Sequence, residues 1–104
     1  MEDCIFCKIR DSEIPAKKIY EDDKCYAVFD INPRAKTHIL VVPNKHIRSI
    51  AKMDAGDEQI IGHLVKVAKK IASDSNLPGY KLVFNVEKHG GQEIFHIHMH
   101  LLSD

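Results

Sequence analysis

The pattern of apolar and polar residues along the chain changes from strand-like to helical and back to strand-like. The clearest strand is residues 37–43, an apolar and β-branched run that ends at a proline. Apolar residues between 60 and 71 recur at intervals of three and four, which predicts one long helix. Shorter strands are predicted at 18–20, 25–30 and 80–85, and a short helix at 6–10. This order of elements predicts an α+β fold.

The closing segment, residues 96–102, alternates three histidines with apolar residues. Successive side chains of a strand point to opposite faces, so His96, His98 and His100 are predicted to share one face. Same-face neighbours lie roughly 6–7 Å apart, a spacing that suits a phosphate group or a metal ion. An exposed strand face without a ligand would more naturally carry threonine, lysine and glutamate.

A glycine-bearing turn precedes the histidine segment and predicts an antiparallel hairpin with residues 80–85. In that hairpin Asn85 and Gln92 would flank the histidine face. The glycines at 90 and 91 allow backbone N–H groups to approach a phosphate closely. The pair of strands and its turn are therefore expected to form the functional end of the chain.

Two kinds of chemistry compete for the histidine face. In the first, a histidine attacks phosphorus and forms a covalent phosphoramidate. In the second, the histidines bind a catalytic zinc ion. The sequence shows no serine or cysteine nucleophile beside a base and no P-loop, so a histidine must be the reactive group of an enzyme. The zinc mechanism lacks a convincing general-base carboxylate near the histidine segment, where only Glu93 is close. The Gly-Gly-Gln loop, which can hold a phosphate, favours attack on phosphorus.

The N-terminal Cys4-x-x-Cys7 spacing allows two thiolates to reach one tetrahedral zinc, although it supplies half of a site. The alternative is a pair of cysteines packed as small apolar residues. A thioredoxin-like redox motif is less expected, because no strand precedes the pair. The odd total of three cysteines is unlike a disulfide framework and favours a reducing, cytoplasmic location.

Length and charge limit the function further. One domain, residues 1–104, is expected for this length, and a small symmetric oligomer suits a chain of this size. Fifteen basic and fifteen acidic side chains cancel, so nucleic acid and anionic membranes are not expected as partners. No apolar run approaches the ~20 residues of a membrane span, and the N-terminus lacks the pattern of a signal peptide.

The histidine segment closely resembles the signature of the histidine triad (HIT) family, which alternates histidine with hydrophobic residues. The likeness extends along nearly the whole chain, in motifs typical of the Hint branch. Those motifs are residues 4–8, 13–17, 20–23, 29–33, 37–43 and 85–92.

The resemblance implies a fold and an activity. The implied fold is α+β, with an antiparallel sheet of about five strands, one long helix and one short helix. The branch comprises purine nucleoside phosphoramidases and related nucleotide hydrolases, so an AMP-like purine nucleotide is the expected ligand, with no catalytic cofactor. A dinucleoside polyphosphate hydrolase and a nucleotide-binding regulatory protein with little turnover are the alternatives. Members usually form homodimers with a sheet continuous across both chains.

The resemblance also implies roles for particular residues. Taken alone, Asp30 is a turn-capping aspartate and His38 a structural histidine. In the family's pattern Asp30 occupies the position that binds ribose hydroxyls, and His98 is the nucleophile that forms a nucleotidyl-histidine. The implied catalytic residues are His98, His100, His38 and Gln92. The implied substrate-binding residues are Asp30, Asn85, Gly91, Glu93, Ile5, Phe6, Ile9, Ile14, Val28 and Ile31.

In zinc-containing members the CxxC pair joins two histidines. The corresponding residues here are Cys4, Cys7, His46 and His96, a Cys₂His₂ set typical of a structural zinc site. His96 would then be a structural ligand beside the reactive His98.

The chain departs from the family's pattern at three places. Glu93 stands where many members carry a serine that assists the leaving group; a carboxylate there suits an amine and repels polyphosphate. Val86-Glu87 replaces a more typical small or glycine-bearing pair, which is expected to alter the loop. The sequence also ends at Ser103-Asp104, without the Gly-Gly pair and tail that shape leaving-group specificity in the branch.

Overall fold

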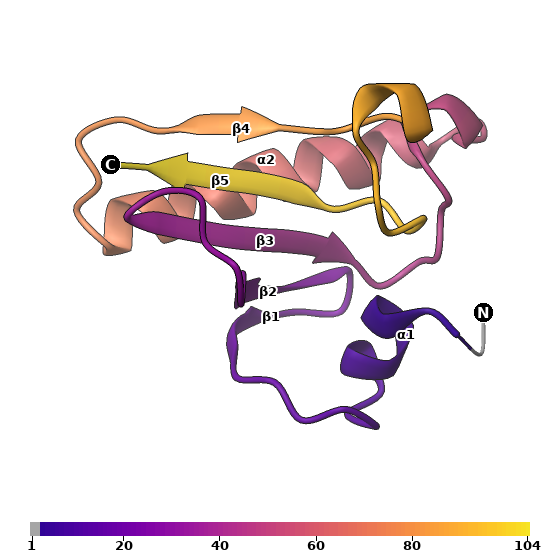
Figure 1. Ribbon diagram of the computed structural model, residues 1–104, viewed down its shortest axis with the longest axis horizontal. Coiled ribbons are helices and arrows are strands. Elements are labelled where there is room, and N and C mark those ends of the chain that lie inside the picture. The colour runs from indigo at the N-terminus through magenta and orange to yellow at the C-terminus, as the bar shows by residue number, and fades with distance from the viewer. Residues whose placement is uncertain (1–2) are drawn as a thin grey trace.

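The predicted strands form one antiparallel sheet in the computed structural model, which describes residues 3–104 (Figure 1). In the sheet the strands follow the order β1-β2-β3-β5-β4, so the last strand lies between β3 and β4. Five strands and two α-helices confirm the expected α+β architecture. The strands are β1 (Lys18–Glu21), β2 (Cys25–Phe29), β3 (Thr37–Pro43), β4 (Lys81–Val83) and β5 (Met99–Ser103). The helices are α1 (Ile5–Arg10) and α2 (Asp57–Asp74), with 3₁₀ turns at Ile50–Lys52 and Lys88–Gly90.

Strand alternation divides the sheet into two different faces. One face packs on the apolar stripe of α2 and carries alternate residues such as Ala27, Val41 and Met99. The residues between them point the other way, where Val28 and Leu40 pack with residues of α1. The two helices therefore cover opposite faces of the sheet.

The face toward α1 is only partly covered, because α1 has six residues. The Tyr26 hydroxyl donates a 2.8 Å hydrogen bond to the backbone carbonyl of Phe6 and fixes the helix over one end of the sheet. Cys4 caps the helix, with its sulfur accepting from the backbone N–H of Cys7. The rest of this face is left open for a ligand.

The histidine segment is less regular than its pattern predicts. Strand β5 begins at Met99, so His96, which lies in a bend, and His98 both precede the regular strand. The backbone N–H of Ile97 donates to the carbonyl of Ile47 instead of joining the sheet. The predicted division of faces is nevertheless confirmed, because Ile97, like the apolar residues of β5 that follow it, packs in the core against α2.

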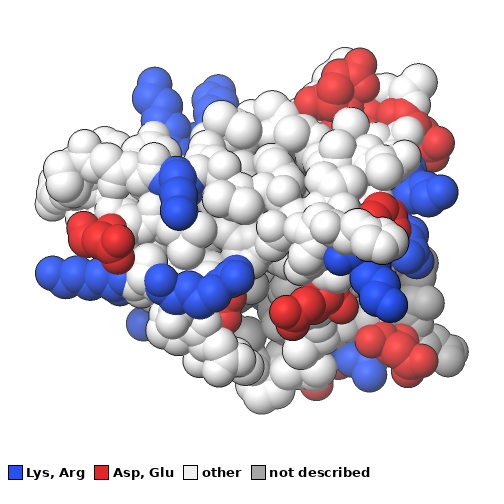
Figure 2. All heavy atoms as spheres, turned by 45° about the horizontal axis from the view of Figure 1, so that its top comes forward, with Lys and Arg blue, Asp and Glu red and all other residues white. Residues whose placement is uncertain are grey.

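The surface carries both signs of charge. Figure 2 shows acidic and basic side chains on the same face of the molecule, in keeping with the net charge of zero. Among residues 3–104, no helix combines the length and the apolar character that crossing a bilayer requires.

Candidate active site and metal centre

A cavity of about 590 Å³ opens on the sheet face that α1 leaves uncovered. We call it the large cavity. Its walls come from α1, the end of β2, the β2–β3 loop and the segment 85–100. Nine of the ten predicted substrate-binding residues line it, namely Ile5, Phe6, Ile9, Val28, Asp30, Ile31, Asn85, Gly91 and Glu93. Ile14 instead packs beside the apolar cluster beneath α1.

Hydrogen bonding fixes which nitrogen of His98 is reactive. The Nδ1 atom lies 2.8 Å from the carbonyl oxygen of His96, so Nδ1 carries the proton and donates it. The Nε2 atom of a neutral His98 is then an unprotonated lone pair. Burial lowers the pKa of His98 below its usual value, which favours this neutral form. His98 lines the large cavity, so the geometry provides a nitrogen nucleophile there.

Two successive hydrogen bonds, the first from a backbone N–H, determine which nitrogen of His100 carries its proton. The N–H of Arg34 donates to His38 Nδ1 at 3.1 Å, so the proton of neutral His38 resides on Nε2. That Nε2–H donates to His100 Nδ1 at 2.8 Å. The proton of His100 must therefore lie on its Nε2, and burial lowers the pKa of His100 to about 4. Both rings line the cavity, with centroids 5.0 Å apart, so His98 offers an unprotonated nitrogen and His100 a neighbouring N–H donor.

The Asp30 carboxylate contacts two neighbouring residues. One carboxylate oxygen accepts the backbone N–H of Asn32 at 2.8 Å, the turn-capping role expected from sequence alone. The other lies 3.4 Å from Nε2 of His38. The side chain also lines the large cavity, where a carboxylate can accept hydrogen bonds from a diol. Both interpretations of Asp30 from the sequence are compatible with this position.

The loop before the histidines is held by Gln92. Its side-chain amide donates to the carbonyls of Arg48 and Ile94, and its oxygen accepts the N–H of Glu87 at 2.8 Å. Gln92 is buried and does not line the large cavity, so these bonds support a positioning role for its side chain. Direct participation of Gln92 in catalysis stays a prediction.

Glu87 takes an unusual backbone conformation in the same loop. Its φ is +59°, a region that glycine enters without strain and glutamate rarely adopts. The carboxylate accepts from the Ser49 hydroxyl and pairs with Arg48 at 3.2 Å. These bonds compensate for the backbone conformation at a position where the family's pattern favours a small residue.

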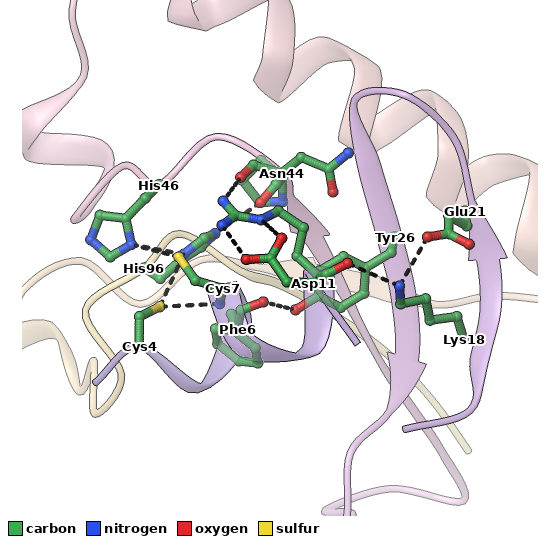
Figure 3. A network of polar contacts seen from close by, with 12 residues as sticks. Cys4, Phe6, Cys7, Asp11, Lys18, Glu21, Tyr26, Asn44, His46 and His96 are labelled. Atoms are coloured by element: carbon green, nitrogen blue, oxygen red, sulfur yellow. Dashed lines mark hydrogen bonds and ion pairs between the residues drawn. The ribbon is translucent and has the colours of Figure 1, made fainter. Parts of the chain in front are cut away.

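Four potential metal ligands converge beside α1, at the other end of the histidine segment (Figure 3). We call Cys4, Cys7, His46 and His96 the thiol–imidazole cluster. The Cys4 sulfur lies 3.3 Å from His96 Nδ1, and the Cys7 sulfur lies 3.4 Å from His46 Nδ1. Bond lengths of about 2.3 Å for Zn–S and about 2.0 Å for Zn–N place S and N about 3.5 Å apart in a tetrahedral site. The observed separations match this value.

The protonation of His96 also fits a metal ligand. Its Nε2–H donates to the carbonyl oxygen of Pro43 at 2.8 Å, so the Nδ1 lone pair faces the cysteines. Burial lowers the pKa of this fully buried ring to about 4 and keeps the lone pair free. A backbone carbonyl on the distal nitrogen is the usual support of a metal-binding histidine. The donor types, their convergence and this support all fit zinc.

The structure adds residues that sequence reasoning missed. Arg34 comes from the β2–β3 loop and lines the large cavity, where its Nη2 lies 3.4 Å from Nδ1 of His100. Leu40 and Ile94 extend the apolar wall. Leu40 could have been found from alternation along β3, because it shares a face with His38. No sequence pattern indicates Arg34 as a site residue, since it lies in an irregular loop 66 positions from its histidine partner.

Together these features define a histidine triad protein with an additional Cys₂His₂ cluster. Residues 11–104 match the family model described as HIT domain, and the chain belongs to that family. The resemblance seen in the sequence is thereby confirmed.

Relatives and solved structures agree with this assignment. The chain is 47% identical over 104 residues to the purine nucleoside phosphoramidase of Escherichia coli (strain K12), covering 98% of this chain and 87% of that protein. Protein HitA of Neisseria gonorrhoeae is 41% identical, with 99% and 97% covered. A HIT family hydrolase from Legionella pneumophila Philadelphia 1 superposes with a TM-score of 0.93 at 46% identity, covering 97% and 92% of the chains. A histidine triad protein from Clostridium difficile gives 0.96 at 42% identity, covering 100% and 92%.

Proposed function

We propose that the protein is a nucleoside phosphoramidase that hydrolyses the P–N bond of purine nucleoside phosphoramidates. One observation carries the proposal: the unprotonated Nε2 of His98 lies in the large cavity beside the Nε2–H donor of His100. The 47% identity to a purine nucleoside phosphoramidase supports the substrate class.

The mechanism follows from the two tautomers. Nε2 of His98 attacks the α-phosphorus while the P–N bond breaks, and the amine leaves with the electron pair of that bond and a proton taken from water. The Nδ1–H bond to the carbonyl of His96 stabilises the positive charge that the attacking ring acquires. His100 donates through Nε2 to a phosphoryl oxygen as negative charge develops there. Water then cleaves the nucleotidyl-histidine, so that phosphoramidate and water give nucleoside monophosphate and amine.

The nucleoside would occupy the apolar part of the large cavity. Phe6, Ile9 and Val28 offer a wall for a purine ring, and Asp30, which lines the same cavity, would accept hydrogen bonds from the ribose hydroxyls. Gly91, with φ of +88°, and Asn85 line the same cavity and would lie near the phosphate. This arrangement supports an AMP-like ligand.

The thiol–imidazole cluster is proposed to hold a structural zinc ion. Four protein ligands would fill a tetrahedral shell and leave no position for substrate. When bound, the ion would tie α1 to the segment that carries His98. The histidines would then carry out the reaction at phosphorus, and the zinc ion would stabilise the fold.

Assembly and location complete the proposal. Residues 1–104 are taken as a single domain that forms a homodimer, in which the three-residue edge strand β4 extends the sheet into a second chain. The three free thiols favour a reducing compartment, which agrees with a cytoplasmic location.

The test is a substrate panel combined with trapping of the adduct. Adenosine 5′-phosphoramidate should be converted to AMP and ammonia, with a higher kcat/KM than a dinucleoside polyphosphate. Mass spectrometry after an alkaline quench should show nucleotidylated wild-type protein and unmodified His98→Asn. Preference for the polyphosphate would favour the alternative hydrolase, and tight AMP binding without turnover would favour a regulatory protein.

A further inference from the structure

Arg34 differs from the other two arginines in having no acidic partner among residues 3–104. Arg10 pairs with Asp11 at 2.8 Å, and Arg48 pairs with Glu87 at 3.2 Å. The Arg34 side chain instead contacts a ring nitrogen, with its Nη2 3.4 Å from Nδ1 of His100. That nitrogen is already occupied by the N–H of His38 at 2.8 Å, so the guanidinium is only weakly engaged. Its donors are free for a ligand.

The reactive site needs a positive charge that its histidines do not provide. Nδ1 of His38 and Nδ1 of His100 each accept an N–H, so neither ring carries a second proton and both are neutral. Asp30 adds a carboxylate 3.4 Å from His38. Among the described residues, two cations line the large cavity, Lys17 and Arg34, and Arg34 is the one in contact with a triad histidine. A phosphate group beside the histidines would therefore meet a neutral-to-negative site if Arg34 were absent. Desolvating an anion in such a place is costly without an opposite charge.

The position of Arg34 fits this need. It lines the large cavity and also a second cavity of about 540 Å³, and it shares both walls with Asn85 and His100. No other charged residue lines both cavities among those that the structure describes. The junction of the two cavities is thus where the reacting phosphate, with a nucleoside on one side and a leaving group on the other, would be placed.

We propose that Arg34 is a substrate-binding residue whose guanidinium binds the α-phosphate of the nucleotide. Arginine suits this role because its planar fork can bind two phosphate oxygens at once. The inference rests on the proposed function in that it assumes the large cavity receives a nucleoside monophosphate group.

The backbone and side chain of Arg34 can be separated by mutation. The bond that sets the tautomer of His38 comes from the backbone N–H of Arg34, which a substitution retains. Arg34→Gln removes the charge and Arg34→Lys retains it without the fork. Lys36→Gln is the matched control, because Lys36 is a cation of the same loop that lines neither cavity.

The experiment is calorimetric binding of AMP and of adenosine to the wild type and the three variants. We expect Arg34→Gln to weaken AMP binding about 10- to 100-fold, the effect of one charge-assisted contact, and to change adenosine binding less than about twofold. Arg34→Lys should fall between the two, and Lys36→Gln should match the wild type. Added salt should weaken AMP binding more in the wild type than in Arg34→Gln.

The outcomes separate this inference from the proposed function. If the wild type prefers AMP to adenosine and Arg34→Gln retains that preference, the role of Arg34 is overturned while the proposed function stands. An equal loss of AMP and adenosine binding in Arg34→Gln would also overturn it, because that pattern indicates a structural role. A wild type that binds the two ligands equally, or binds neither, would overturn both.

Discussion

His96 and His98 stand two residues apart, yet they belong to clusters that use the imidazole ring in different ways. In the thiol–imidazole cluster, the Nδ1 lone pair of His96 points toward sulfur and nitrogen atoms that are themselves electron donors. Around His98 each ring nitrogen has a directional role: Nδ1 donates to a carbonyl and Nε2 remains free in the cavity. Backbone carbonyls select opposite tautomers in the two rings, Nε2–H in His96 and Nδ1–H in His98. The difference shows that the hydrogen-bond partner of each ring, more than its place in the motif, determines what a triad histidine can do.

The strongest way to break this comparison is to substitute each of the two histidines separately. His98→Asn should lower kcat/KM for a phosphoramidate by about 10⁴-fold or more, because no other nucleophile lies at that position. Its metal content and unfolding free energy should stay close to wild type. His96→Asn should instead lower the zinc content and the unfolding free energy, because it removes a fully buried ring from the proposed zinc site. Elemental analysis, chemical denaturation and the hydrolysis assay on both variants check the contrast. Loss of metal in His98→Asn would show that the clusters are not separate.

The next largest effect concerns the cysteines. Cys7→Ser should lower the unfolding free energy by roughly 3 kcal/mol and abolish stoichiometric zinc, since a structural metal contributes directly to folding. Cys25→Ala is the control, because Cys25 is equally buried but lies in the core against α2. Full zinc content in Cys7→Ser would contradict the ligand assignment.

The smallest expected effect is the dependence of stability on pH through His100. Its pKa is lowered to about 4 in the folded protein from an ordinary value of 6.5. Between these values the unfolded chain binds a proton that the folded chain does not, so stability falls as the pH falls below 6.5. Between about pH 7 and about pH 4.5 this residue alone accounts for about 2 kcal/mol. Denaturation at about pH 7 and about pH 4.5 should show a smaller loss in His100→Gln than in the wild type. Equal losses would show that the ring does not titrate this way.

The local pattern of apolar and polar residues is sufficient to predict the regular helices and strands of the fold. The β-branched run of β3 and the helical spacing of α2 each identify a face that must be buried, and both elements appear where the pattern places them. Alternation along residues 96–98 predicts a strand, but the N–H of Ile97 donates to the carbonyl of Ile47, and the ring of His96 donates to the carbonyl of Pro43 at the end of β3, so the regular ladder begins only at Met99. Such long-range pairing leaves no periodic signal in the sequence.

The site was predictable to the extent that a family motif carried it. Asp30 and His38 are unremarkable alone and were assigned through the resemblance. Arg34 belongs to no such motif position, and its place at the junction of two cavities depends on how the β2–β3 loop folds over His100. The engagement of the Gln92 amide with three backbone groups is likewise a product of tertiary structure.

Helix α1 links the two clusters mechanically, because its six residues include both Cys7 of the thiol–imidazole cluster and Phe6 of the cavity wall. Cys7 faces the thiol–imidazole cluster, and the adjacent Phe6 lines the large cavity and contacts the ring of His98. A helix this short is not stable by itself in water, so anything that holds one side organises the other. Bound metal and bound nucleotide would then strengthen each other by the same factor. The rate at which a chelator strips the metal would fall as nucleotide is added, so that a colorimetric zinc dye would report on occupancy of the cavity.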